Sequence, residues 1–440
     1  MSRLLIPLTI AVVQTCVGSV FAQMDFEHEP INYSKTKPTD RISKLVAKLD
    51  SGSIELKHDD AHGYLQSLLN HLEIPVSSQT LVFSKTSFQR HRISRKTPRA
   101  LYFNDDVYVG WVQHGDMIEL STADPKLGAI FYTLDQSTDE PPKFQRQTDH
   151  CMICHASTHT RRVPGHIMRS VYTDRSGMPV FASGTFRTDH KSPFDERWGG
   201  WFVTGTHGSQ RHMGNEFVAS KLEPDKLDVE SGANVTSLAD RIDTSPYLGE
   251  HSDVVALMVL AHQVALHNAI TTANYSARRT IRDAEVMNKA LDREDGFESE
   301  SAKRRFTSAA NQLVEWLLMV DETELTGPVA GTSGFAKEFE AMGPFDKSGR
   351  SLRQLDLKRR MFKYPCSFLI YSEAFDAIPD RLRNEVYQRM WDILTGKDTS
   401  EEFEHLSEKD RLAIRSILIE TKTGLPDFWV SDTESKQLTE

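Results

Sequence analysis

Five consecutive residues, Cys151-Met152-Ile153-Cys154-His155, carry the clearest chemistry in the chain. The two thiols are three positions apart, and an imidazole follows the second thiol directly. Thiols at this spacing can add to the two vinyl groups of a haem while the adjacent histidine ligates the iron. The motif therefore predicts one covalently attached haem c, with Cys151 and Cys154 as thioether sites and His155 as the proximal iron ligand.

Three other interpretations of the motif stay open at this point. A structural zinc site needs four ligands, usually as two pairs, and the chain has no second Cys pair. A thioredoxin-like redox pair needs a strand that leads into a helix and lowers the thiol pKa, and residues 143–150 do not resemble a buried strand. A plain disulfide between Cys151 and Cys154, or a chance occurrence of the pattern, is the third.

The N-terminus has the pattern of an export signal. Arg3 is the only charge before an apolar run from Leu4 to Val13. The run is followed by small residues, ending at Ala22, at the positions that signal peptidase usually requires before its cleavage site. We expect cleavage after Ala22, so that residues 1–22 are a signal peptide and the mature protein is periplasmic or otherwise exported. Haem is attached to c-type proteins outside the bacterial cytoplasmic membrane, so the motif and the leader predict the same compartment.

The composition is that of an ordinary globular protein. Of the 440 residues, 39% are hydrophobic and 26% are charged, and the formal net charge is −10. A mildly acidic exported chain is not expected to bind nucleic acid. Cleavage also removes Cys16, so Cys366 is the one thiol left outside the motif, and we expect it to be buried and free. The most apolar run after the leader, Val254 to Ala261, is too short to span a bilayer, so no membrane span is expected in the mature chain.

Residues 80–134 follow the period of two that is typical of β-strands. Turn-forming residues such as Asp124-Pro125 separate the β-rich runs at 80–83, 100–103, 107–112, 117–120 and 129–134. These runs predict an antiparallel meander before the motif, and further strands are expected after it at 167–172 and 178–186. Helical spacing predicts short helices at 40–50 and 60–72.

Beyond about residue 245 the pattern becomes helical. Ser252 or Asp253 is expected to cap a long helix to about Arg293, and shorter helices follow at 303–320, 334–342, 366–377, 380–394 and 408–422. We therefore predict an α+β fold with a β-rich N-terminal half that carries the haem motif and an all-helical C-terminal half. The expected division is a mixed haem-binding region at 23–245 and a helical region at 246–440 that packs on it.

Several side chains could ligate the other face of the iron. His207, His212 and Met213 lie together in a Gly-rich loop, where glycines would let the backbone approach a flat macrocycle, and they are the first candidates. His262 and His267, on the most apolar helix, come second. They are five residues apart and point to different sides of the helix, so at most one of them can reach the haem.

Basic residues on both sides of the motif have two possible roles. They could contact haem propionates or an acidic partner, or they could be parts of solvated loops. The residues concerned are Arg90, Arg92, Arg95, Lys96 and Arg99 before the motif, and Arg161, Arg162 and Arg169 after it.

The sequence CMICH resembles the attachment motif of the c-type cytochromes, and this resemblance covers five residues. The length, the strand content and the position of the motif differ from the small helical cytochrome c fold. The stretches RWGGWFVTGTHG, HMGN and PCSFLIYSEAFDAIP are similar to those of large, exported, single-haem bacterial proteins, and this resemblance implies no particular reaction. A single CxxCH argues against two-haem peroxidases and multihaem electron conduits.

Three functions are compatible with this sequence. The first is an exported mono-haem cytochrome that transfers electrons to or from a redox partner protein. The second is a haem-c oxidoreductase that acts on peroxide or another small-molecule substrate, with an open iron position and a base such as His190, His207 or His212. The third is a haem-based sensor. The sequence alone does not decide whether the protein is an enzyme.

Overall fold

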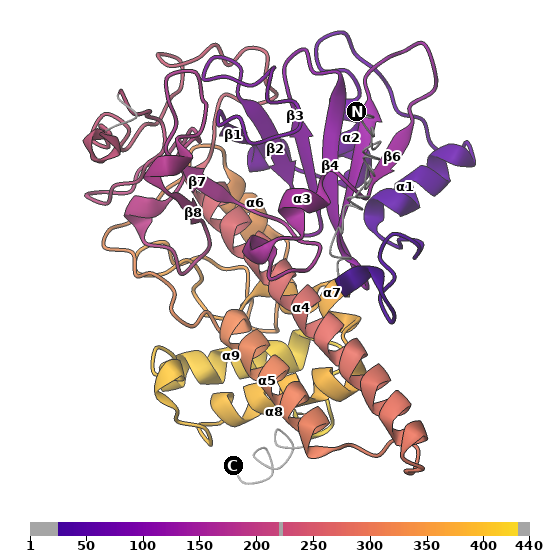
Figure 1. The fold of residues 1–440 in the computed structure, drawn as a ribbon. Helices are drawn as coiled ribbons and strands as arrows, with labels where there is room; N and C mark the ends of the chain where they lie inside the picture. The colour runs from indigo at the N-terminus through magenta and orange to yellow at the C-terminus, as the bar shows by residue number, and fades with distance from the viewer. Residues whose placement is uncertain (1–24, 220–222, 430–440) are drawn as a thin grey trace, which may run out of the picture.

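The computed structural model describes residues 25–219 and 223–429 (Figure 1). The predicted signal peptide lies outside the described residues. Strands occupy the upper part of the molecule in Figure 1 and helices the lower part. The predicted α+β class, with strands in the N-terminal half and helices in the C-terminal half, is confirmed.

The main sheet is an antiparallel meander in which each strand pairs with the next strand along the chain. Burial alternates residue by residue along the fourth strand, because successive side chains point to opposite faces, and this is why period two predicted it. The last strand was not predicted, since it is a half-buried edge strand with a polar sequence. The strands are β1 (Thr80–Val82), β2 (Arg99–Phe103), β3 (Val107–Trp111), β4 (Met117–Asp124), β5 (Gly128–Asp135) and β6 (Phe144–Gln147).

Two short helices precede the sheet, as predicted. The carboxylate of Asp40 caps α1 (Arg41–Asp50) by accepting hydrogen bonds from the backbone N–H groups of Ile42 and Ser43. Helix α2 (Leu65–Leu72) begins later than expected and buries its four leucines.

The motif lies between two sheets. After β6 the chain forms the single-turn helix α3 (Met152–His155) and then a two-stranded sheet of β7 (Arg169–Val171) and β8 (Thr185–Arg187). The strands predicted at 167–172 and 178–186 are therefore shorter than expected, with an isolated bridge between Thr173 and Pro179 at the turn.

The longest helix, α4 (Val254–Ala290), extends from the sheet region into the helical half (Figure 1). The carboxylate of Asp253 caps its first turn, at 2.8 Å from the backbone nitrogen of Val255. By length and composition α4 could cross a membrane, and its most apolar stretch is entirely buried inside the fold. The buried part of this helix is longer than the apolar run from Val254 to Ala261, because burial continues through polar residues to Thr271.

Most of the remaining helices lie around the lower part of α4 in Figure 1, but the helix at Phe335–Ala341 lies beside its upper part. The helix predicted at 366–377 is divided into a 3₁₀ turn at Phe368–Tyr371 and α7, because Ser372 caps a new helix there. The capping box of Ser407 and Asp410 is present. The helices are α5 (Glu300–Leu317), α6 (Phe335–Ala341), α7 (Glu373–Asp376), α8 (Asp380–Leu394) and α9 (Glu408–Thr421).

Two buried hydrophobic clusters form the core, and both cross the predicted division at 245 and 246. The cluster around α4 takes in Trp198, Trp201 and strand residues such as Phe103, while Tyr275 of α4 belongs to the cluster of the N-terminal half. The two predicted regions therefore share their packing, and their separation into domains stays a prediction.

Candidate functional site

The five-residue motif forms one helical turn on the surface of the sheet region. The N–H of His155 donates to the carbonyl of Cys151 at 2.9 Å, which closes the turn. Met152 is buried and anchors the turn in the core, whereas Ile153 and Cys154 are exposed and Cys151 is half-buried. The turn therefore holds both thiols and the imidazole within one short, anchored segment.

The ring of His155 is held in one tautomer. Its Nδ1 lies 2.9 Å from the carbonyl oxygen of Gly165, which can only accept a hydrogen bond. Nδ1 must therefore carry the proton, and Nε2 carries the lone pair. Burial lowers the pKa of His155 to about 4, so the ring is neutral near pH 7. A neutral imidazole whose other nitrogen donates to a carbonyl is the form in which histidine ligates metals.

Helix α4 fixes the backbone that orients His155. The side chain of Asn268 accepts from the N–H of His166 at 2.8 Å and donates to the carbonyl of His166 at 2.7 Å. The preceding residue must be glycine, because a Cβ on Gly165 would lie 2.3 Å from Oδ1 of Asn268. Asn268 thus holds the backbone at residues 165–166. The carbonyl of Gly165 in this segment sets the tautomer of His155, the predicted proximal ligand. Sequence reasoning missed this residue, which is 102 positions from its partner.

A second buried histidine lies beside this segment. The ring centroid of His166 is 4.5 Å from that of Tyr108 and 6.0 Å from that of Phe131, which in turn lies 4.6 Å from the ring of His155. Both ring nitrogens of His166 are buried without a hydrogen-bond partner, and burial moves its pKa well below the usual value. His267 lies 6.1 Å from it, and its Nε2 donates to the carbonyl of Asp105 at 2.8 Å. The only sequence signal for His166 was its place after Pro164-Gly165, downstream of the motif.

The environment of the thiols disfavours a thioredoxin-like pair. Burial, followed by the charge of Glu119, raises the pKa of Cys151 to about 11, whereas a reactive redox thiol needs a lowered pKa. An edge strand does precede the motif, but the helix that follows it has a single turn. Cys366 is buried and free, as predicted, and burial raises its pKa.

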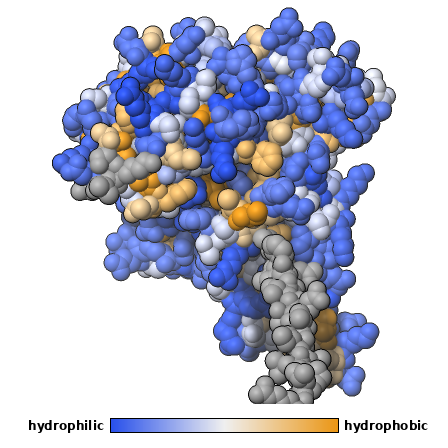
Figure 2. All heavy atoms as spheres, turned by 45° about the horizontal axis from the view of Figure 1, so that its top comes forward, coloured by the Kyte–Doolittle hydropathy of each residue, from blue (hydrophilic) through white to orange (hydrophobic). Residues whose placement is uncertain are grey.

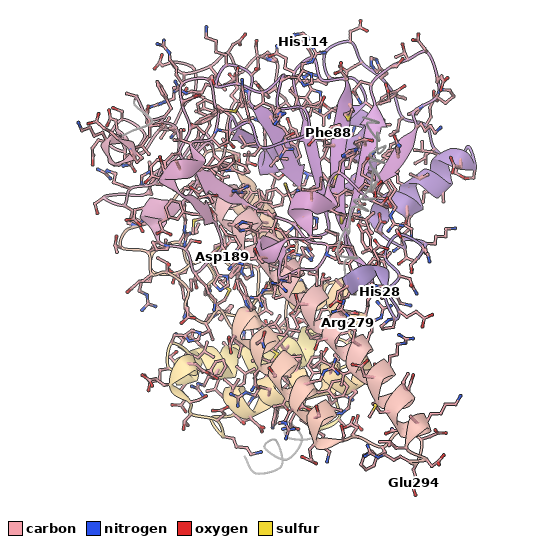
Figure 3. All side chains as sticks on the ribbon, in the orientation of Figure 1. His28, Phe88, His114, Asp189, Arg279 and Glu294 are labelled. Carbon is pink, nitrogen blue, oxygen red and sulfur yellow. The ribbon has the colours of Figure 1, made fainter. Side chains whose placement is uncertain are left out.

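Exposed apolar side chains and an ion pair lie next to the motif. Ile153 is 71% exposed and Phe88 is 59% exposed, and the Phe88 ring lies 6.3 Å from the ring of His150. Figure 3 shows Phe88 in front of the sheet, and Figure 2 shows a gathering of apolar residues near the middle of an otherwise hydrophilic face. A contiguous exposed apolar patch can mark a surface that a ligand or partner covers, whereas single exposed apolar residues are common. Arg99 and Glu119, whose charges act on His155, form a 2.6 Å ion pair.

The residues of the motif fit a covalent haem c. The two thiols are free, one is exposed, and the histidine beside them presents its lone pair on Nε2. Within residues 25–219 and 223–429 no three His, Cys, Asp or Glu side chains are grouped to hold a metal ion by themselves. A haem requires only one or two protein ligands, because the porphyrin supplies four.

The structure brings His207 and His212 together, with ring centroids 4.7 Å apart, in a cluster with Phe194 and Trp198. Nδ1 of His207 donates to the carbonyl of Gln210 at 2.8 Å, and its Nε2 accepts from the N–H of Asn234 at 2.9 Å. Both nitrogens of His207 are therefore engaged within the loop.

The other two loop candidates are less firmly engaged. Nδ1 of His212 accepts from the N–H of Gly214, which leaves the proton on a buried Nε2 that has no partner. The sulfur of Met213 accepts a 3.6 Å hydrogen bond from Ser170. Nothing in these contacts identifies the distal ligand, and the loop assignment stays a prediction.

Glycines 199 and 200 serve the packing of the chain itself. A Cβ on Gly199 would lie 2.6 Å from the carbonyl oxygen of Val171, and one on Gly200 would lie 2.6 Å from Cβ of Ser84. This pair lets the chain pack against Val171 of β7 and against Ser84 after β1. The predicted approach of the loop glycines to a macrocycle stays a prediction.

The helix histidines occupy two different sites. His267 joins His166, as described above. His262 pairs with His190 through their Nδ1 atoms at 3.1 Å, and its Nε2 lies 2.7 Å from the hydroxyl of Ser367. All three residues are buried, so His190 is not placed at the surface as a general base. As predicted from their spacing, His262 and His267 point to different surroundings.

Several of the basic residues around the motif contact other side chains. Arg92 binds Asp116 at 2.8 Å, Arg95 lies over the ring of Phe217, and Arg169 donates to the hydroxyl of Thr185. Arg161 lies over the ring of Trp316 at 5.0 Å. The role of the basic residues toward propionates or an acidic partner stays a prediction.

Comparisons of the chain with protein-family models, with curated proteins and with solved structures give no match.

Proposed function

We propose that this protein is an exported mono-haem c-type cytochrome that takes part in electron transfer. The hydrogen bond from Nδ1 of His155 to the carbonyl of Gly165 is the observation that carries the proposal. It leaves the lone pair on Nε2, in the same turn as two free thiols. Cys151 and Cys154 would hold the haem covalently, and His155 would be its proximal ligand.

The chain contributes anchoring and orientation at this site. Met152 fixes the turn in the core, and Asn268 fixes the backbone segment whose Gly165 carbonyl sets the tautomer and orientation of His155. A haem c, when bound, supplies an iron that accepts and releases one electron. A covalent link keeps such a group from being lost outside the cell, which suits the exported location that the leader predicts.

The size of the protein supports the proposal that it binds a redox partner protein. A carrier alone needs on the order of one hundred residues, and this chain has 440. The exposed Ile153 and Phe88 next to the motif are suited to contact either the haem edge or a redox partner protein.

Haem attachment can be tested on the full chain, expressed with its leader and with bacterial haem-attachment machinery. We expect the intact mass of the mature protein to include one haem and a denaturing gel to stain for haem. The double variant Cys151→Ala/Cys154→Ala should lose both signals, whereas Cys366→Ala should keep them. A correctly exported wild-type chain without the added mass would overturn the proposal.

Electron transfer can be separated from catalysis by ligand binding. For a carrier, we expect ferric protein to show a six-coordinate iron that binds cyanide slowly or not at all. Rapid cyanide binding together with peroxide turnover would favour the haem-c oxidoreductase instead.

A further inference from the structure

A cleft with an unusual charge pattern lies between α4 and α5. These two helices run side by side in the lower half of Figure 1. The cleft has a volume of about 390 Å³, and three arginines line it: Arg161 from the loop after the motif, and Arg304 and Arg305 from α5. None of its lining residues is acidic, although the chain has 62 acidic and 52 basic residues. The cleft is therefore a local concentration of positive charge on an acidic protein.

Two of the three guanidinium groups form no ion pair with a described residue, although the charges of Asp189 and Glu315 act on Arg161 and that of Glu300 acts on Arg304. Arg305 forms a 2.7 Å ion pair with Asp283. Among the residues that the structure describes, the side chains of Arg161 and Arg304 make no hydrogen bond or ion pair. Arg161 only lies over the ring of Trp316, and burial together with the charge of Arg187 lowers its pKa, against weaker opposing effects of Asp189 and Glu315. Each guanidinium thus has several N–H donors directed at no protein acceptor.

The rest of the lining defines the size and nature of an occupant. Small side chains of α4, Ala269 and Ala273, face Ala309 of α5 and leave room between the helices, and four hydroxyl-bearing residues lie among them. Guanidinium groups bind carboxylate and phosphate oxygens in a bidentate geometry, and hydroxyls add further donors. The apolar surface that these alanines provide is small, so it fits only a ligand with a short hydrocarbon chain.

We propose that the α4–α5 cleft is a binding site for a small organic oxyanion, a carboxylate or phosphate ester with a short apolar body. Arg161 and Arg304 bind the oxyanion, and Ala269 and Ala273 contact the apolar part. The site stands apart from the proposed haem chemistry, because none of its lining residues belongs to the Cys151–His155 motif.

Binding can be measured by titration calorimetry on the full mature chain, with butyrate, succinate and inorganic phosphate as probes and choline as a cationic control. We expect saturable binding of at least one anion in the millimolar range or tighter, and none of choline. Binding of butyrate or succinate assigns a carboxylate ligand. Binding of phosphate alone assigns a phosphate ester.

Variants locate the site. Arg161→Gln and Arg304→Gln should each weaken binding by about tenfold or more, since each removes a charge-assisted hydrogen-bond donor. Lys303→Gln is the matched control, because Lys303 is the exposed neighbour of Arg304, pairs with Glu300 and does not line the cleft. Arg304 is exposed, so Arg304→Gln should fold normally. This variant therefore still tests the binding site if Arg161→Gln fails to fold. Absence of saturable anion binding, or an equal loss in Lys303→Gln, would overturn the proposal.

Discussion

The turn at 151–155 and the loop at 207–213 both carry candidate iron ligands in the sequence, one in the turn and three in the loop, yet their surroundings differ. In the turn, His155 donates from Nδ1 to a carbonyl and keeps its Nε2 lone pair, and Cys154 is exposed. In the loop, His207 uses both of its nitrogens in hydrogen bonds to Gln210 and Asn234. The comparison teaches that ligand density is a property of sequence, whereas ligand availability depends on which nitrogen the fold has already engaged.

The sharpest contrast is expected between His155 and His207. Replacing the proposed proximal ligand, as in His155→Ala, should abolish the low-spin signal of haem-loaded protein and shift the reduction potential by on the order of 100 mV, within the ~0.8 V range that axial ligands control. His207→Ala should leave both unchanged. EPR spectra and redox titration check this, and an unchanged spectrum in His155→Ala would remove His155 as a ligand.

Within the loop, Met213→Leu and His212→Gln are the informative variants. If the loop supplies the distal ligand, one of them should convert the iron to a high-spin or ligand-exchangeable form. His207→Ala should not, because its nitrogens are engaged. A change in His207→Ala alone would mean that the loop rearranges when haem binds. No change in any of the three would reject the loop assignment.

The role of Asn268 can be compared with that of Asn274 on the same helix. Asn268→Ala leaves the N–H and carbonyl of His166 without partners, and two such buried groups cost about 2–5 kcal/mol of unfolding free energy. It should also loosen His155 and shift the haem potential. Asn274→Ala removes a hydrogen bond to the carbonyl of Ala377 and should lower stability in urea without altering the potential. Equal potentials in the two variants would make Asn268 a merely structural residue.

Buried histidines predict how stability depends on pH. In the chain without haem, burial lowers the pKa of His155 to about 4 and that of His212 to about 3, below the unfolded value of about 6.5. Between these pKa values the unfolded chain binds more protons, so stability falls as the pH is lowered from about 6.5 toward 4, by up to about 1.4 kcal/mol per pH unit for each such histidine. Urea unfolding at several pH values measures the slope.

Two variants test the origin of that slope. His212→Gln should reduce the slope of the unfolding free energy against pH by the contribution of one histidine. His114→Asn should not, because His114 is exposed at the top of the molecule in Figure 3 and asparagine tolerates its positive φ of 54°. Glu322, whose pKa burial raises to about 7, contributes a slope of the opposite sign, so the comparison of variants is decisive. An unchanged slope in His212→Gln would contradict the assignment of a neutral buried histidine.

Much of the fold followed from local pattern. Alternation predicted β1 to β5, and the capping signals of Asp253 and of Ser407 with Asp410 placed the starts of α4 and α9. Strand β6 was missed because an edge strand needs no buried face. The length of α4 was predicted, but its buried part extends beyond Ala261 because tertiary contacts also bury its later polar residues.

The sequence by itself determined the spacing of two thiols and a histidine, since the chemistry of haem attachment requires only five neighbouring residues. It also determined the types of most helices and strands, because side-chain period and caps act over a few positions. Only the tertiary structure decided which nitrogen of His155 is available, that Asn268 holds its acceptor, and that His166 lies beside it. These depend on contacts such as that of Asn268 with His166, 102 residues apart, which chain folding creates and no local pattern encodes.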